Sequence, residues 1–208
     1  MTKFIRRVIF RPMSVWEHRV AVPYRRLRFI LSCWLQGVEL VLGRNVKFFH
    51  PVRVWGVGGR IVIEDNVHFA FYGVNRWLGP IHFQMRAPDA QLRIEQGCWI
   101  MQNVQFACFS SITLGAETAV GGGCVFLDSD VHDFSPDGWS RLGRCGSIVI
   151  GRNVKICPET TILKGVRIGD HAVIGNKSVV QKSLPERCVA AGNPARVFLQ
   201  YPAEATAK

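Results

Sequence analysis

Apolar residues recur every six positions between Ile150 and Val180, and this is the clearest pattern in the chain. The positions are Ile150, Ile156, Ile162, Ile168, Ile174 and Val180. A small or β-branched residue follows each of the first five after four places. A period of six differs from the 3.6-residue period of a helix and from the alternation of a simple strand. It is typical of a parallel β-helix, in which short strands stack and share one continuous core.

The same period extends towards the N-terminus, with interruptions. The positions that keep it are Leu42, Phe48 and Val54, then Ile63 and Phe69, then Ile94, Ile100, Phe106 and Ile112. It then shifts by two residues, to Leu114, Val120 and Phe126. Residues 55–91 blur the pattern, and Tyr72, Asn75, Trp77, Pro80 and Pro88 suggest irregular or protruding segments there. Their aromatic side chains either cover one end of the core or stack on a sugar ring.

A loop interrupts the coil after Phe126. The next in-phase positions carry His132, Gly138 and Arg144, and these residues do not suit a dry core. Residues 127–147 therefore read as a loop that leaves the coil, about one turn in length. Long loops on rigid solenoids often carry function. We expect an all-β domain over residues 41–198, a tail over 199–208, and a separate N-terminal segment over 1–40.

The N-terminal segment combines positive charge with apolar side chains. Residues 1–36 hold eight Lys and Arg residues against a single acid, Glu17. The apolar run from Leu27 to Leu42 is shorter than the roughly 20 residues of a membrane span. We expect a basic amphipathic helix, for which two placements fit. It lies against an anionic membrane surface, or it packs over one end of the β-helix or against a sister subunit.

Composition narrows the class of protein. The chain has 208 residues, of which 48% are hydrophobic, and this is enough for one domain with a core. A net charge of +11 calls for an anionic partner, but no nucleic-acid-binding motif is present, so a phosphorylated cofactor or an anionic membrane is expected. Seven cysteines without C-x-x-C spacing predict neither disulfides nor a metal site. The N-terminus lacks a secretory signal, and we expect a cytoplasmic protein, peripheral on the inner face of the membrane.

Four motifs carry a resemblance to a known family. They are D-S-D-V-H-D-F at 128–134, I-G-R-N-V at 150–154, V-V-Q-K-S-L-P at 179–185 and A-G-N-P-A-R-V at 191–197. With the repeat, they resemble the hexapeptide-repeat acyltransferases, above all the maltose and galactoside acetyltransferases and the bacterial surface-polysaccharide O-acetyltransferases. The resemblance is good from Ile112 to Phe198. It implies a left-handed parallel β-helix, a homotrimer with sites between subunits, and acetyl-CoA as the acyl donor.

The resemblance also implies catalytic residues, and His132 matches the family's catalytic histidine. A sugar hydroxyl is a poor nucleophile near neutral pH, whereas imidazole can accept its proton and return it to the leaving thiolate. Asp130 or Asp133 would orient the imidazole, unless both only cap turns. Asn103 lies twelve residues before Gly115, the spacing of the family's oxyanion-stabilising asparagine.

Coenzyme A contacts follow from the same motifs. The matching positions are Pro158, Asn176, Gln181, Lys182 and Arg196, with Lys177 assisting. Lys182 and Arg196 are the expected partners of the phosphates. Two departures stand out: Lys155 replaces a tryptophan that many relatives carry, and Pro158 replaces a small residue. Cys124 and Cys157 are expected to be packed structural cysteines rather than nucleophiles.

These inferences predict an acetyl-CoA-dependent O-acetyltransferase. Its acceptor would be a sugar hydroxyl of a cell-surface polysaccharide or of the lipid-linked precursor. Two alternatives remain open: N-acetylation of an amino sugar or xenobiotic, and a β-helix that serves only as a scaffold.

Overall fold

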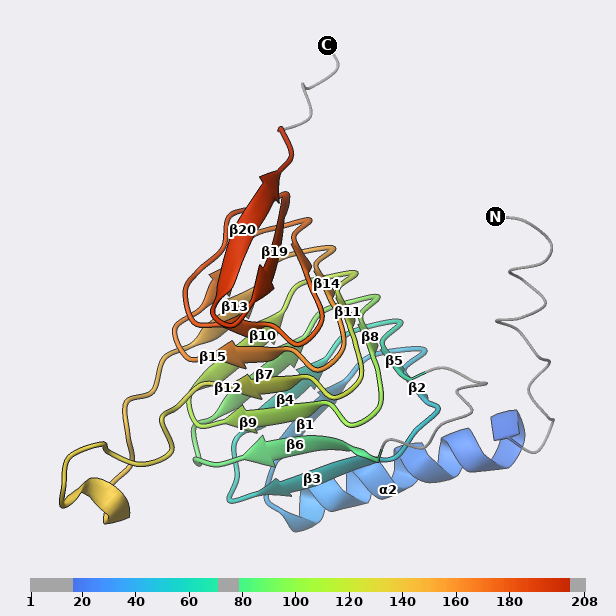
Figure 1. Ribbon diagram of the computed structural model, residues 1–208. Coiled ribbons are helices and arrows are strands. Elements are labelled where there is room, and N and C mark those ends of the chain that lie inside the picture. Colours follow the sequence, from blue (N-terminus) through green and yellow to red (C-terminus); the bar gives the residue numbers. More distant parts are fainter. Residues whose placement is uncertain (1–16, 71–78, 203–208) are drawn as a thin grey trace, which may run out of the picture.

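Three sheets, parallel except for the last pair of strands, wrap into a triangular coil in the computed structural model, which describes residues 17–70 and 79–202 (Figure 1). Sheet A contains β1 (Glu39–Leu42), β4 (Arg60–Ile63), β7 (Gln91–Ile94), β10 (Ser111–Leu114), β13 (Ile148–Ile150) and β16 (Arg167–Ile168). Sheet B contains β2 (Lys47–Phe48), β5 (His68–Phe69), β8 (Trp99–Ile100), β11 (Ala119–Val120), β14 (Lys155–Ile156), β17 (Val173–Ile174), β19 (Cys188–Gly192) and β20 (Ala195–Gln200). Sheet C contains β3 (Val52–Gly56), β6 (Ile81–Met85), β9 (Gln105–Cys108), β12 (Val125–Leu127), β15 (Thr161–Leu163) and β18 (Val179–Val180). Our expectations for residues 1–16 and for Tyr72, Asn75 and Trp77 lie outside the described residues.

The strand register shows where the coil carries extra residues. The residues stacked in sheet A are Leu42, Ile63, Ile94, Leu114, Ile150 and Ile168. Successive turns therefore take 21, 31, 20, 36 and 18 residues. The turn of 18 residues is three bare hexapeptides, and every longer turn holds insertions. The six repeat positions from Ile150 to Val180 are at most 3% exposed, which confirms the predicted core.

The prediction of an irregular region over residues 55–91 is wrong for β6. Ile81, Phe83 and Met85 are buried and pair in register with β3 and β9. The strand alternates apolar and polar residues as any strand with one buried face does. The extra residues before and after it moved it out of phase with the period of six, and this hid it.

At the corners between sheets A and B the backbone is left-handed. The residues there are Asn45, Asn66, Gly97, Glu117, Asn153, His171 and Arg187, with φ between 52° and 71°. Asparagine and glycine adopt this conformation most readily.

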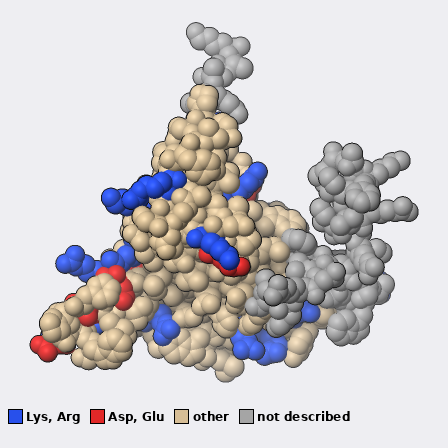
Figure 2. Space-filling model, in the orientation of Figure 1, with Lys and Arg blue, Asp and Glu red and all other residues tan. Residues whose placement is uncertain are grey.

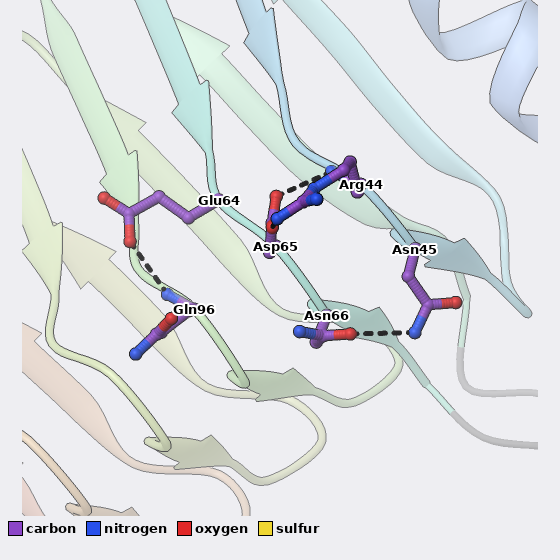
Figure 3. A network of polar contacts seen from close by, with 6 residues as sticks. All are labelled: Arg44, Asn45, Glu64, Asp65, Asn66 and Gln96. Carbon is purple, nitrogen blue, oxygen red and sulfur yellow. Dashed lines mark hydrogen bonds and ion pairs between the residues drawn. The ribbon is translucent and has the colours of Figure 1, made fainter.

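Polar side chains join successive A–B corners (Figure 3). Asn45 Nδ2 donates to Asn66 Oδ1 at 2.8 Å, and Arg44 donates to the Asp65 carboxylate at 2.8 Å. The Arg44 backbone N–H and guanidinium hold the pKa of Asp65 below its ordinary value. One turn of the coil is thereby tied to the next outside the core.

Six phenylalanines form a ladder through the core. They are Phe29, Phe48, Phe69, Phe83, Phe106 and Phe126, all fully buried. Neighbouring ring centroids lie 4.7 to 5.9 Å apart, within the range of favourable aromatic pairs. The ladder runs from the N-terminal helix to the strand that precedes the long loop.

The N-terminal helix closes one end of the coil. A π-helical turn, η1 (Glu17–Ala21), leads into α2 (Val22–Leu35), which lies below β3 across the end of the sheets (Figure 1). Val22, Phe29 and Cys33 are buried, Phe29 and Cys33 belong to the core, and Phe29 packs on Phe48 at 5.1 Å between ring centroids. Helix packing over the end of the β-helix, one of the two expected placements, is therefore confirmed. Among the described residues, no helix is long and apolar enough to cross a membrane.

Candidate functional site

Residues 128–147 form a loop that leaves the coil after β12 and returns at β13, with one 3₁₀ turn, η2 (Gly138–Ser140) (Figure 1). Asp128 anchors the base of this loop. Its buried carboxylate accepts hydrogen bonds from the backbone N–H groups of Phe109 and Ser110, both at 2.8 Å. Burial nevertheless raises the pKa of Asp128 above its ordinary value. Asp128 was not among the predicted site residues, although an acid that directly follows a buried strand at a loop entry was a usable signal.

His132 is half-buried and stacks on the exposed ring of Trp139. The two ring centroids are 4.5 Å apart and the planes differ by 8°. His132 Nδ1 lies 2.7 Å from the Trp139 carbonyl oxygen. A carbonyl can only accept, so in the neutral ring Nδ1 carries the hydrogen and Nε2 keeps its lone pair. This is the form of histidine that can act as a general base.

The chain turns sharply just before His132. Val131 has a φ of 64°, a conformation that a β-branched residue rarely adopts. Its N–H donates to Ser129 Oγ at 2.8 Å. Such strain persists where the surrounding structure enforces it, and it is concentrated at functional sites.

The two aspartates beside His132 have other partners. Asp130 pairs with Lys164 at 2.9 Å, and Asp133 accepts hydrogen bonds from Ser135 N at 3.1 Å and Ser135 Oγ at 3.0 Å. Among the described residues, neither carboxylate contacts the His132 ring. Of the two predicted roles, orienting the imidazole or capping a turn, Asp133 shows the second, and the Trp139 carbonyl is the group that holds Nδ1.

The predicted site residues lie at two different edges of sheet C. His132, Gln181 and Lys182 follow strands of sheet C and lie where the chain passes to sheet A, here called the C–A edge. Asn103, Pro158, Asn176 and Lys177 lie where the chain passes from sheet B to sheet C, the B–C edge, and are joined turn to turn by backbone hydrogen bonds. About five extended residues separate the edges, which is roughly 16 Å at about 3.3 Å per residue. Within one chain, the structure does not bring the asparagine to the histidine.

A hollow of about 430 Å³ marks the B–C edge. Asn103, Pro158 and the glycines at 121–123 line it. A Cβ on Gly121 would lie 2.5 Å from the Pro158 nitrogen, so the two turns meet here with no room for a side chain. Asn103 has a φ of 56°, which also makes it an ordinary corner residue. The Lys177–Glu159 pair, 3.6 Å apart and exposed, contributes little to stability.

The remaining predicted cofactor residues are exposed. Lys155 lies on the outer surface of β14, between Ala119 and Val173 of the neighbouring strands. Arg196 lies on β20, which pairs antiparallel with β19 opposite Ala191. Cys124 is buried, and burial raises its pKa to about 11, whereas Cys157 is half-buried. A thiol with such a pKa is a poor nucleophile at neutral pH, as expected for Cys124.

Comparisons with known proteins agree with this fold. The family described as bacterial transferase hexapeptide (six repeats) matches residues 147–182. The putative acetyltransferase YvoF of Bacillus subtilis is 29% identical over 66% of this chain and 73% of its own length. The putative lipopolysaccharide biosynthesis O-acetyl transferase WbbJ of Escherichia coli is 31% identical over 47% of this chain and 55% of its own length. The galactoside O-acetyltransferase of Escherichia coli is 52% identical over 62% of this chain and 63% of its own length. The chain thus spans between about half and three quarters of these relatives.

Solved structures give the same result for the fold. The polysialic acid O-acetyltransferase OatWY has a TM-score of 0.65 at 23% identity, over 82% of this chain and 80% of that one. A galactoside acetyltransferase in complex with coenzyme A has a TM-score of 0.50 at 21% identity, over 96% and 91%. The repeat, the fold and the relatives make the chain similar to the hexapeptide-repeat acyltransferases, and the predicted left-handed parallel β-helix is confirmed.

Proposed function

We propose that the protein is an O-acetyltransferase that moves an acetyl group from acetyl-CoA to a sugar hydroxyl. The acceptor is a cell-surface polysaccharide or its lipid-linked precursor. Support comes from relatives named for lipopolysaccharide, galactoside and polysialic acid acetylation, and from a neighbour that binds coenzyme A. The observation that carries the chemistry is the hydrogen bond from His132 Nδ1 to the Trp139 carbonyl, which leaves Nε2 able to accept a proton.

The reaction then follows from the imidazole. His132 Nε2 accepts the proton of the sugar hydroxyl while the hydroxyl oxygen attacks the thioester carbonyl carbon. As the tetrahedral intermediate collapses, the carbon–sulfur bond breaks and Nε2 returns the proton to the leaving sulfur. The products are the acetylated sugar and the free thiol of coenzyme A. A backbone carbonyl is neutral, so it fixes the ring without drawing its proton away.

A trimer would bring the two edges of sheet C together. In a closed three-fold assembly, the C–A edge of one copy meets the B–C edge of the next. The outer surface of sheet C favours such packing because it becomes apolar towards its upper strands, with Val125, Leu127, Leu163 and Val179 half-buried on it. Asn103 of one copy would then stabilise the oxyanion that forms beside His132 of its neighbour.

Coenzyme A would lie between the copies, along the C-terminal half of the coil. Asn176 and Lys177 stand on one wall of this groove, and Gln181 and Lys182 on the other. Lys182 and Arg196 would bind the phosphates, because hydrogen bonds between charged groups are the strong ones. Lys155 and Pro158 would also line the groove. Because Lys155 replaces a tryptophan, the groove would lack an apolar wall there.

The first test is His132→Ala. We expect coenzyme A release from acetyl-CoA and methyl β-galactoside or short oligomers of sialic acid to fall 10²- to 10⁴-fold, which is about the contribution of a general base. His171→Ala, a half-buried histidine at an A–B corner, is the matched control and should leave the rate unchanged. A wild-type rate for His132→Ala would exclude the proposed base. The same assay with glucosamine reports on N-acetylation.

The second test asks whether two chains share one site. His132→Ala and Asn103→Ala subunits are inactivated at different edges, so each mixed trimer would contain one intact site. At equal mixing the activity should recover to about one quarter of the wild-type value. No recovery, with trimers shown by sedimentation, would contradict the shared site while leaving the chemistry of His132 in place.

A further inference from the structure

Helix α2 is apolar on two opposite faces. Val22, Phe29 and Cys33 pack on the end of the coil, as described above. The residues of its outer face are Tyr24, Leu27, Leu31, Trp34 and Leu35. They recur at helical spacing on the side opposite Phe29, and they are 47% to 74% exposed. Soluble proteins rarely expose a contiguous apolar stripe of this kind unless it contacts something.

The charges beside this outer face are all positive. Residues 19–35 contain four arginines and neither Asp nor Glu. In the view of Figure 2, basic side chains and no acidic ones lie along the lower margin, where α2 runs. Arg28 lies over the Tyr24 ring, 5.8 Å from its centroid. This helix therefore presents an apolar stripe bordered by cations.

A groove of about 580 Å³ continues the positive surface on one flank of α2. Arg25 and Arg28 from the helix and Arg53 from β3 stand on its walls, and Pro51 and Val52 line its apolar side. The Arg25 guanidinium also donates to the Phe49 carbonyl at 2.8 Å, which fixes this cation beside the groove. Phosphate-bearing headgroups match such a surface in charge.

We propose that the outer face of α2 docks on an anionic lipid bilayer. Tyr24, Leu27, Leu31, Trp34 and Leu35 enter the interfacial region, and the arginines meet the headgroups. The helix lies across the end of the coil, so this face points away from all three sheets (Figure 1). A second copy of the same helix is a poorer occupant, because it would bring four more arginines against these without any acid between them. The inference goes beyond the acetyl transfer proposed above and does not depend on it.

The test is co-sedimentation of the full chain with vesicles of phosphatidylglycerol and phosphatidylcholine. We expect binding to mixed vesicles and none to pure phosphatidylcholine, because the arginines need anionic headgroups. Leu27→Ser/Leu31→Ser should weaken binding at least tenfold, since it removes two apolar anchors. Arg26→Gln/Arg28→Gln should weaken it roughly fivefold per arginine. The matched control is Phe198→Ser on β20 at the opposite end of the coil, which removes an aromatic residue that is 68% exposed and should change nothing.

Three results would overturn the proposal. The first is absence of vesicle binding by the wild-type chain, and the second is binding that both α2 variants leave unchanged. The third is a Leu27→Ser/Leu31→Ser variant that binds vesicles normally but sediments as a smaller oligomer than the wild type in sedimentation velocity. This would show that a second copy of the chain covers the apolar stripe. Circular dichroism and turnover of a soluble glycoside by each variant separate lost docking from lost folding.

Discussion

Replacing Gly143 with alanine tests whether the loop must hold His132 in place. A Cβ built on Gly143 lies 2.4 Å from the His132 carbonyl oxygen and 2.7 Å from the Asp130 Cβ. Gly143 is not in the left-handed region, so the contact alone, and not the backbone conformation, opposes the alanine. Non-bonded heavy atoms settle near 3.5 Å, so the His132 backbone must move by about 1 Å. A misplacement of about 1 Å can cost on the order of 100-fold in rate.

We therefore expect Gly143→Ala to lower kcat about 100-fold with the KM for acetyl-CoA nearly unchanged. The assay is coenzyme A release from acetyl-CoA and methyl β-galactoside. The melting temperature should stay close to that of the wild type, because the loop lies outside the core. Ser140→Ala is the control, since this exposed side chain lies in the same loop. A wild-type kcat for Gly143→Ala would show that the position of His132 does not govern the reaction.

Three further predictions concern the core, the pH dependence and the cofactor. Phe106→Ala should lower the free energy of unfolding by about 3–5 kcal/mol in urea, because the ring is fully buried and stacks on Phe126 at 4.7 Å; a loss below about 1 kcal/mol would contradict the ladder. Burial, aided by nearby Lys47, lowers the pKa of His68 from its ordinary 6.5, so the unfolded chain takes up the proton first. Its contribution to stability is thus present above pH 6.5 and is lost as the pH falls towards the folded-state pKa, and His68→Gln should flatten the fall in unfolding free energy between pH 7 and 5. Lys182→Gln should raise the KM for acetyl-CoA about tenfold with kcat unchanged, and an unchanged KM would remove this lysine from the phosphate site.

The sequence was informative wherever the coil is uninterrupted. The six repeat positions from Ile150 to Val180 could be placed on the inside, because strand and corner repeat in every hexapeptide and no insertion changes the spacing. Upstream of Ile150, insertions at several corners change the number of residues between successive strands. The strand Ile81–Met85 has the same alternation, but it is out of phase with its neighbours, so only the strand register reveals it.

The site was predictable in part, for a related reason. A histidine in a position that should be apolar is a visible signal, and this signal singled out His132 as the candidate base. The Trp139 carbonyl that holds its ring could not be found, because every residue has a carbonyl and its direction depends on the fold of the loop. The separation of Asn103 from His132 could have been derived. Asn103 follows Ile100, in phase with sheet B, whereas His132 follows Phe126, in phase with sheet C.

The position of α2 also determines how far the chain can be shortened. β1, β2 and β3 are the first strands of their sheets, so their outward N–H and C=O groups have no strand beyond them. Helix α2 covers all three, and Phe29 packs against Phe48 and Phe83. A chain that began after residue 36 would expose three parallel strand edges at one end, together with the rings of Phe48 and Phe83 that Phe29 covers. Such ends invite strand addition from another molecule, and we expect the truncated coil to aggregate through these edges. Helix α2 thus keeps further strands from adding to the first turn of the coil, whatever its outer face binds.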